Sequence, residues 1–132
     1  MPVELEMAFR ILLAAVLGGI IGYQRERADK SAGIRTNTLI CVGAALFTVV
    51  SIYGFEAADP SRVAAGIVTG IGFIGAGSII RRGGGIIEGL TTAATIWAVA
   101  GIGLAAGAGL YIISVVTAVV VLTILMLPRF TT

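Results

Sequence analysis

The sequence contains the run Arg62-Val-Ala-Ala-Gly-Ile-Val-Thr-Gly-Ile-Gly-Phe-Ile-Gly-Ala-Gly-Ser-Ile-Ile-Arg81, in which 18 uncharged residues, five of them glycine, lie between two arginines. A glycine inside a helix costs about 1 kcal/mol relative to alanine in water, so a soluble helix of this composition would hardly form. In a bilayer the backbone must pair internally, and small residues become packing surfaces. At about 100° per residue the glycines form two faces, one with Gly66, Gly70 and Gly77 and one with Gly72 and Gly75. We predict that residues 62–80 form the central helix of a membrane bundle.

The composition of the whole chain favours the same class of protein. Hydrophobic residues make up 58% and charged residues 12% of the 132 residues, and the mean hydropathy is +1.05. Ordinary soluble domains carry about 25% charged residues. The net charge is +2, and the basic residues lie in short clusters between apolar runs, as in membrane proteins. They do not alternate with aromatic residues, as they would in a surface that binds single-stranded nucleic acid. We therefore expect a single domain with membrane lipids as its surroundings and no nucleic-acid partner.

The residue types that carry most enzyme chemistry are scarce. The sequence has no histidine and a single cysteine, Cys41, which excludes histidine-based nucleophile pairs, histidine metal ligands and an internal disulfide. No pair of acidic residues lies inside an apolar run, so no proton relay or buried cation site is evident. We expect no enzyme activity, no cofactor and no metal site.

Uncharged runs predict an all-α bundle of about five transmembrane helices. The first run has only 14 residues and becomes long enough if Arg10 reaches the membrane surface from within the span. Asp59-Pro60 is a helix-start signal before the glycine run, and residues 81–85 are a predicted flexible turn. The last 40 uncharged residues, 89–128, are predicted to break at 104–110 into two helices, the second peripheral and facing lipid. The predicted spans are residues 7–24, 37–55, 62–80, 90–104 and 110–127.

The basic residues are distributed unevenly over the predicted connections. With five spans, seven lie on one side and two, Arg10 and Arg62, on the other. The seven are Arg25, Arg27, Lys30, Arg35, Arg81, Arg82 and Arg129. The positive-inside rule then predicts a cytoplasmic C-terminus and an N-terminus outside.

A few polar residues are candidates for a ligand or partner site. Arg35-Thr36-Asn37-Thr38 places a guanidinium, an amide and two hydroxyls at a helix start, where they could contact an anion or a lipid headgroup. Thr91 and Thr95 share a helix face with Ala98, although such hydroxyls also bond their own helix carbonyls. Thr92 is a further candidate, together with Arg35, Asn37 and Thr91. Asp59 and Arg62 are more often a helix cap and a local ion pair, and Glu26 lies in a loop whose charges orient the protein.

Small residues recur at helix-packing spacing. The motif Gly70-Ile-Gly-Phe-Ile-Gly75 matches the dinucleotide fingerprint GxGxxG, but that fingerprint needs a preceding strand and an open helix N-terminus. Inside a predicted span we interpret it as a packing surface. Further packing pairs are Gly18 with Gly22 and Gly103 with Gly107. These surfaces exceed what one protomer needs, so we expect a homo-oligomer, with a dimer favoured.

Several blocks of the sequence, in order and with natural spacing, carry a family resemblance. They are Glu26-Arg27, residues 32–36, residues 42–47 with Ser51, residues 59–65, residues 70–77, residues 89–97, residues 101–104 and residues 107–111. Together they resemble the MgtC/SapB family of bacterial membrane proteins. The resemblance implies an inner-membrane protein of about five spans, linked to growth at low magnesium and to survival inside macrophages. It also implies a regulator that binds membrane proteins such as the proton-translocating ATP synthase.

The sequence departs from the family pattern in three places. Longer members carry a soluble C-terminal domain, whereas this sequence stops four residues after Pro128, so we expect a short form that lacks that domain's share of the virulence role. Asn37 stands where many members have histidine, and Glu88 where a basic residue is common.

Three functions remain open from the sequence. The first is a non-enzymatic bundle that acts by helix contacts with itself or a membrane partner. The second is a small transporter or channel for Mg²⁺ or another solute, favoured by glycine-rich helices and membrane-level threonine and asparagine. The third is a cytoplasmic-face ligand site among Arg35, Asn37, Thr91 and Thr92.

Overall fold

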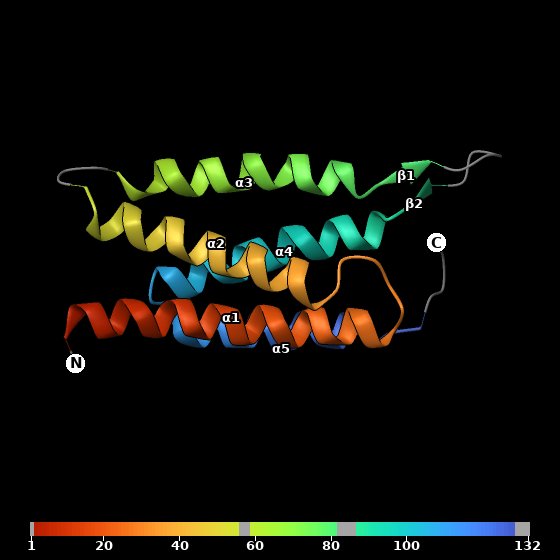
Figure 1. Ribbon diagram of the computed structural model, residues 1–132, viewed down its shortest axis with the longest axis horizontal. Helices are drawn as coiled ribbons and strands as arrows, with labels where there is room; N and C mark the ends of the chain where they lie inside the picture. The colour runs from red at the N-terminus through yellow and green to blue at the C-terminus, as the bar shows by residue number, and fades with distance from the viewer. Residues whose placement is uncertain (1, 56–58, 82–86, 129–132) are drawn as a thin grey trace.

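The described residues form five helices of alternating direction, as predicted. The computed structural model describes residues 2–55, 59–81 and 87–128. The helices are α1 (Val3–Arg27), α2 (Ile34–Tyr53), α3 (Pro60–Gly77), α4 (Leu90–Gly107) and α5 (Tyr111–Leu125). All five run along the long axis of the molecule, so the α1–α2 and α3–α4 connections lie at one end and the N-terminus at the other (Figure 1).

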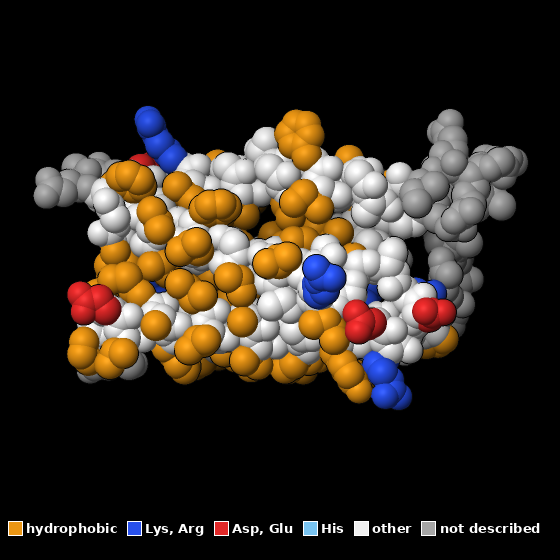
Figure 2. All heavy atoms as spheres, viewed as in Figure 1, with side chains coloured by type: hydrophobic (Ala, Val, Ile, Leu, Met, Phe, Trp, Pro, Cys, Tyr) orange, Lys and Arg blue, Asp and Glu red, His pale blue; other side chains and the backbone are white. Residues whose placement is uncertain are grey.

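Three helices are suited to cross a membrane by length and composition. Within the described residues, α1, α2 and α4 are long and apolar enough, whereas α5 is apolar but has only 15 residues. Hydrophobic side chains cover much of the face in Figure 2, as expected for a lipid-facing surface. The membrane bundle is therefore confirmed, while the number of five spans stays a prediction.

The central helix is α4, and the prediction that residues 62–80 would be central is wrong. α4 contacts each of the other four helices, and α3 lies along one side of the bundle (Figure 1). Only Ile71 and Gly75 of α3 are buried, whereas ten residues of α4 are. The physical reason is that Gly103 and Gly107 let α4 approach the α2 backbone closely, while α3 buries a single stripe against Ile96 and Ala100.

The core is made of small residues that bring backbones together. A Cβ placed on Gly18 would lie 2.7 Å from Cys41 Cβ, and one on Gly22 would lie 2.6 Å from Ile34 Cα. On the other side of α2, a Cβ on Gly107 would lie 2.6 Å from the Ala45 carbonyl oxygen, and one on Gly103 would collide with the Cys41 carbonyl oxygen. Four of the predicted packing glycines thus lie where α2 meets α1 and α4.

A short pair of strands flanks the segment predicted as a flexible turn, residues 81–85. β1 (Ile80–Arg81) and β2 (Ile87–Glu88) pair antiparallel, with Ile80 opposite Glu88. Residues 82–85 of the predicted turn lie outside the described residues, so the turn stays a prediction. Gly89 follows with a φ of 89°, and a Cβ there would collide with the Ser78 carbonyl oxygen, so this position requires glycine.

Asp59 begins α3 as its N-cap, as predicted. Its Oδ1 accepts hydrogen bonds from the Ser61 backbone N–H (3.0 Å) and hydroxyl (2.8 Å), and Pro60 occupies the first helical position. Both bonds lower the pKa of the exposed Asp59 carboxyl, and the bond from the Ser61 hydroxyl has the larger effect. The predicted ion pair with Arg62 is not among the salt bridges of the described residues.

We expect Gly103→Ala to destabilise the bundle by about 1–3 kcal/mol, because the added methyl group must push α2 away from α4. Thermal unfolding in detergent measures the effect. Gly101→Ala is the matched control, since a Cβ on Gly101 meets nothing within 4 Å. Equal unfolding temperatures for the two variants would show that this helix contact is not tight.

We expect Ser61→Ala to raise the pKa of Asp59 towards its ordinary value, because the serine hydroxyl is the main cause of the lowering. The pKa of Asp59 is lower in the folded state than in the unfolded state. The ionised cap therefore stabilises α3 at a pH above the unfolded-state pKa, and this stabilisation is lost as the pH falls through the folded-state pKa. NMR titration of ¹³C-labelled aspartate measures it. Ser61→Thr retains the hydroxyl and should leave the pKa low; an unchanged pKa in Ser61→Ala contradicts the assignment.

Candidate functional site

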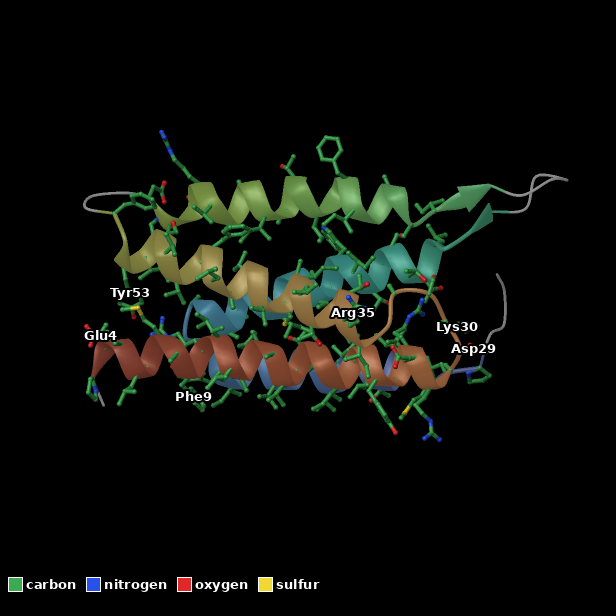
Figure 3. All side chains as sticks on the ribbon, in the orientation of Figure 1. Glu4, Phe9, Asp29, Lys30, Arg35 and Tyr53 are labelled. Atoms are coloured by element: carbon green, nitrogen blue, oxygen red, sulfur yellow. The ribbon has the colours of Figure 1, made fainter. Side chains whose placement is uncertain are left out.

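The charged side chains separate to the two halves of the bundle. Figure 3 labels Asp29 and Lys30 at the end where α1 runs into α2 and Arg35 further inward at the start of α2, and β1, with the backbone of Arg81, lies at the same end. Arg10 and Arg62 come from helix segments at the opposite end. The predicted segregation of positive charge therefore holds for the described residues, while Arg82 and Arg129 lie outside them.

Asn37 is fully buried and stabilises the start of α2. Its Nδ2 donates to the backbone carbonyls of Ala32 (2.7 Å) and Gly33 (3.0 Å), whereas its Oδ1 has no partner among the described residues. Its neighbours Arg35 and Thr36 are exposed on other faces of the same helix. The polar stretch predicted as one contact surface is thus divided between the interior and the outside.

The three threonines of α4 also take different roles. Thr95 is buried, and its hydroxyl donates to the Thr91 carbonyl oxygen one turn earlier at 2.8 Å. It therefore bonds its own helix, which is the structural alternative to a ligand contact. The Thr91 side chain is exposed. Thr92 is buried, and its Oγ1 lies 3.0 Å from Ser31 Oγ in the α1–α2 loop. Within the described residues no hydrogen bond joins Thr91 or Thr92 to Asn37 or Arg35.

Arg25 is the functional candidate that sequence reasoning missed. Only 4% of it is exposed, and its Nη2 donates to the Ser31 carbonyl oxygen at 3.1 Å and to Thr92 Oγ1. The signal was present in the spacing, because residue 25 continues the buried α1 face of Ala14, Gly18 and Ile21 at intervals of three and four. The residue was instead counted with the loop charges.

Arg10 lies inside the opposite end of the bundle rather than at its surface. It is 7% exposed, pairs with Glu6 at 3.4 Å and donates to the Gly107 carbonyl oxygen at 3.0 Å. Its Nε also donates to the Tyr111 hydroxyl at 3.3 Å. Polar groups of α1, α4 and α5 thus pair with this side chain within the bundle, while its reach to the membrane surface stays a prediction.

Glu26 acts as a local cap between α1 and α2. Its Oε1 accepts a 3.4 Å hydrogen bond from the Ile34 backbone N–H at the start of α2. The N-cap residue of α2 is Gly33, which has no side chain that could accept this hydrogen bond. Within the described residues, Glu26 and the other acidic groups form no cluster of three or more metal-ligating side chains.

An apolar groove of about 630 Å³ lies between α2, α3 and α4. Gly43, Gly66 and Gly70 line it together with Phe47 and Ile67, and Figure 2 shows the face hollowed beside α3. A Cβ on any of these three glycines would meet nothing within 4 Å. The same holds for Gly72 and Gly77, whereas Gly75 packs against Ala93 with ordinary contacts from 3.7 Å.

Comparison with known proteins gives the family. The model of the MgtC family matches residues 11–132. The chain is 47% identical over 128 residues to the Escherichia coli K12 protein named "Putative magnesium transporter YhiD", covering 91% of this chain and 59% of that one. It is also 47% identical over 116 residues to protein MgtC of Brucella abortus strain 2308, covering 88% and 48%.

A third relative, an uncharacterized protein of Haemophilus influenzae, is 44% identical over 130 residues, covering 92% of this chain and 55% of that one. The chain thus spans roughly half the length of these curated relatives. No solved structure matches it. The resemblance found in the residues is confirmed, and the chain belongs to the MgtC family.

Proposed function

We propose that the chain is a non-enzymatic membrane protein that acts through helix contacts with a second copy of itself or with another membrane protein. The carrying observation is the glycine-lined groove, since Gly66 and Gly70 of α3 and Gly43 of α2 bring no side chain into it. In a membrane, helix association depends on close packing of such small residues. A dimer through α3 is the simplest assembly that would cover this groove.

The cellular setting is part of the same proposal. We place the chain in the bacterial inner membrane with five spans and a cytoplasmic C-terminus, supported by the cations gathered at the α1–α2 and α3–α4 end. The link to magnesium limitation, and that to survival inside host cells, are supported by family membership. An ATP synthase subunit is a candidate membrane partner by the same resemblance.

We expect the double variant Gly66→Leu, Gly70→Leu to lose association, because two leucines fill the groove and keep a second helix at a distance. Single-molecule photobleaching in liposomes, or light scattering in detergent, counts the protomers. Gly72→Leu is the matched control, because this exposed glycine of α3 does not line the groove. Unchanged association of the double variant rules out this surface.

Transport of Mg²⁺ is the competing function, and it is supported by the name of the Escherichia coli relative. Against it stands the described part of the chain, in which no three acidic, cysteine or histidine side chains come together. Thr95 donates its hydroxyl to a carbonyl of its own helix, whereas Asn37 Oδ1 has no partner among the described residues. Asn37 is therefore the side chain by which this alternative is best tested.

We accordingly expect liposomes containing the purified chain to take up Mg²⁺ no faster than protein-free liposomes, as read by an enclosed magnesium-sensitive dye. Uptake that disappears in Asn37→Ala or Thr95→Val would favour the transporter over helix contacts. Thr123→Val is the control, because this exposed hydroxyl lies near the end of α5 and bonds its own helix.

A further inference from the structure

The start of α4 holds a buried guanidinium with an unused donor. More than nine-tenths of Arg25 is buried, and both of its described hydrogen bonds, to the Ser31 carbonyl oxygen and to Thr92 Oγ1, use Nη2. Its Nε is buried and has no acceptor in the described part of the chain. The hydroxyl of Ser31 lies 3.0 Å from that of Thr92, so three polar side chains meet at one point.

The electrostatics of this point are unusual, because two positive groups meet. Thr92 is the third residue of α4, whose N-cap is Gly89 and has no side-chain cap. The free N–H groups of such a first turn give it about half a positive charge. Arg25 adds a full charge beside it, and among the side chains that the structure describes, which do not include that of Glu88, no carboxylate lies within ion-pair distance of Arg25. Burying an uncompensated cation costs several kcal/mol.

The acidic side chains at the end of α1 and in the loop that follows do not offset the cost of burying the Arg25 charge. Glu26 is exposed and accepts from the Ile34 backbone N–H, on the α2 side of the loop. Asp29 is exposed and forms no salt bridge with Arg25 among the described residues. Exposed Lys30 and Arg35 add further positive charge at this end.

We propose that Arg25, Ser31 and Thr92, with the first turn of α4, bind a phosphate group. A guanidinium, two hydroxyls and backbone N–H groups are donors that converge from different directions, which suits the several oxygens of phosphate. Ser31 and Thr91 are exposed, so the group can reach the cluster from outside. Its source is either a lipid headgroup at the membrane surface or free phosphate. This inference does not depend on the α3 groove.

The test uses the full chain in a neutral, phosphate-free detergent and measures thermal unfolding in two arms. The first compares sodium phosphate with sodium chloride at equal ionic strength, and the second compares short-chain phosphatidylglycerol with short-chain diacylglycerol. We expect stabilisation by at least one of the phosphate compounds. Stabilisation only in the first arm identifies free phosphate, and only in the second a headgroup; both outcomes support the site.

Variants then locate the binding. We expect Arg25→Lys and Thr92→Val each to weaken the apparent affinity about tenfold or more, equivalent to about 1.4 kcal/mol. If Arg25→Lys does not fold, Thr92→Val, which keeps the shape of its side chain, decides. Arg27→Gln is the control, because exposed Arg27 bonds only Tyr23 on its own helix within the described residues and should change the affinity less than about twofold.

Two results overturn the proposal. The first is no stabilisation beyond chloride and diacylglycerol in either arm. The second is equal weakening by Arg27→Gln and Thr92→Val, which would show that the anion responds to the general positive charge of this end rather than to the cluster.

Discussion

The structure depends on the close approach of the α2 backbone to two helices at once. Cys41 lies between Gly18 of α1 and Gly103 of α4, and neither position has room for a single methyl group. In a bilayer, van der Waals contact of this kind replaces the hydrophobic effect as the force between helices. The three helices that meet here are also the three that are long and apolar enough to cross a membrane. α3 and α5 are added to this unit from outside.

The same face of α1 carries a buried arginine at each end. Arg10 and Arg25 continue the row of Ala14, Leu17 and Ile21 in opposite directions, so packing of α1 draws both guanidinium groups inside. The two buried guanidinium groups have different partners. Arg10 receives a carboxylate and a backbone carbonyl oxygen, whereas Arg25 receives neutral oxygens only and lies beside a helix N-terminus. The asymmetry distinguishes a structural pairing from a cluster suited to a ligand.

The sequence was sufficient for an all-helical fold with about five helices, because a bilayer requires long uncharged runs separated by charged connections. It was not sufficient for which helix is central. Glycine content shows that a helix can be approached closely, but not from which side, so α3 and α4 could not be told apart. Side-chain direction was equally hidden: Asn37 and Arg35 are two residues apart, and only the packing of α2 turns one inward and the other outward.

The position of Cys41 has a consequence for chemistry on this protein. The sole thiol of the chain is fully buried where Gly18 of α1 and Gly103 of α4 approach its side chain and backbone. A maleimide can therefore reach the sulfur only after the packing around it has opened. The chain carries its own reporter of whether the three-helix unit is closed, and nothing needs to be attached to read it.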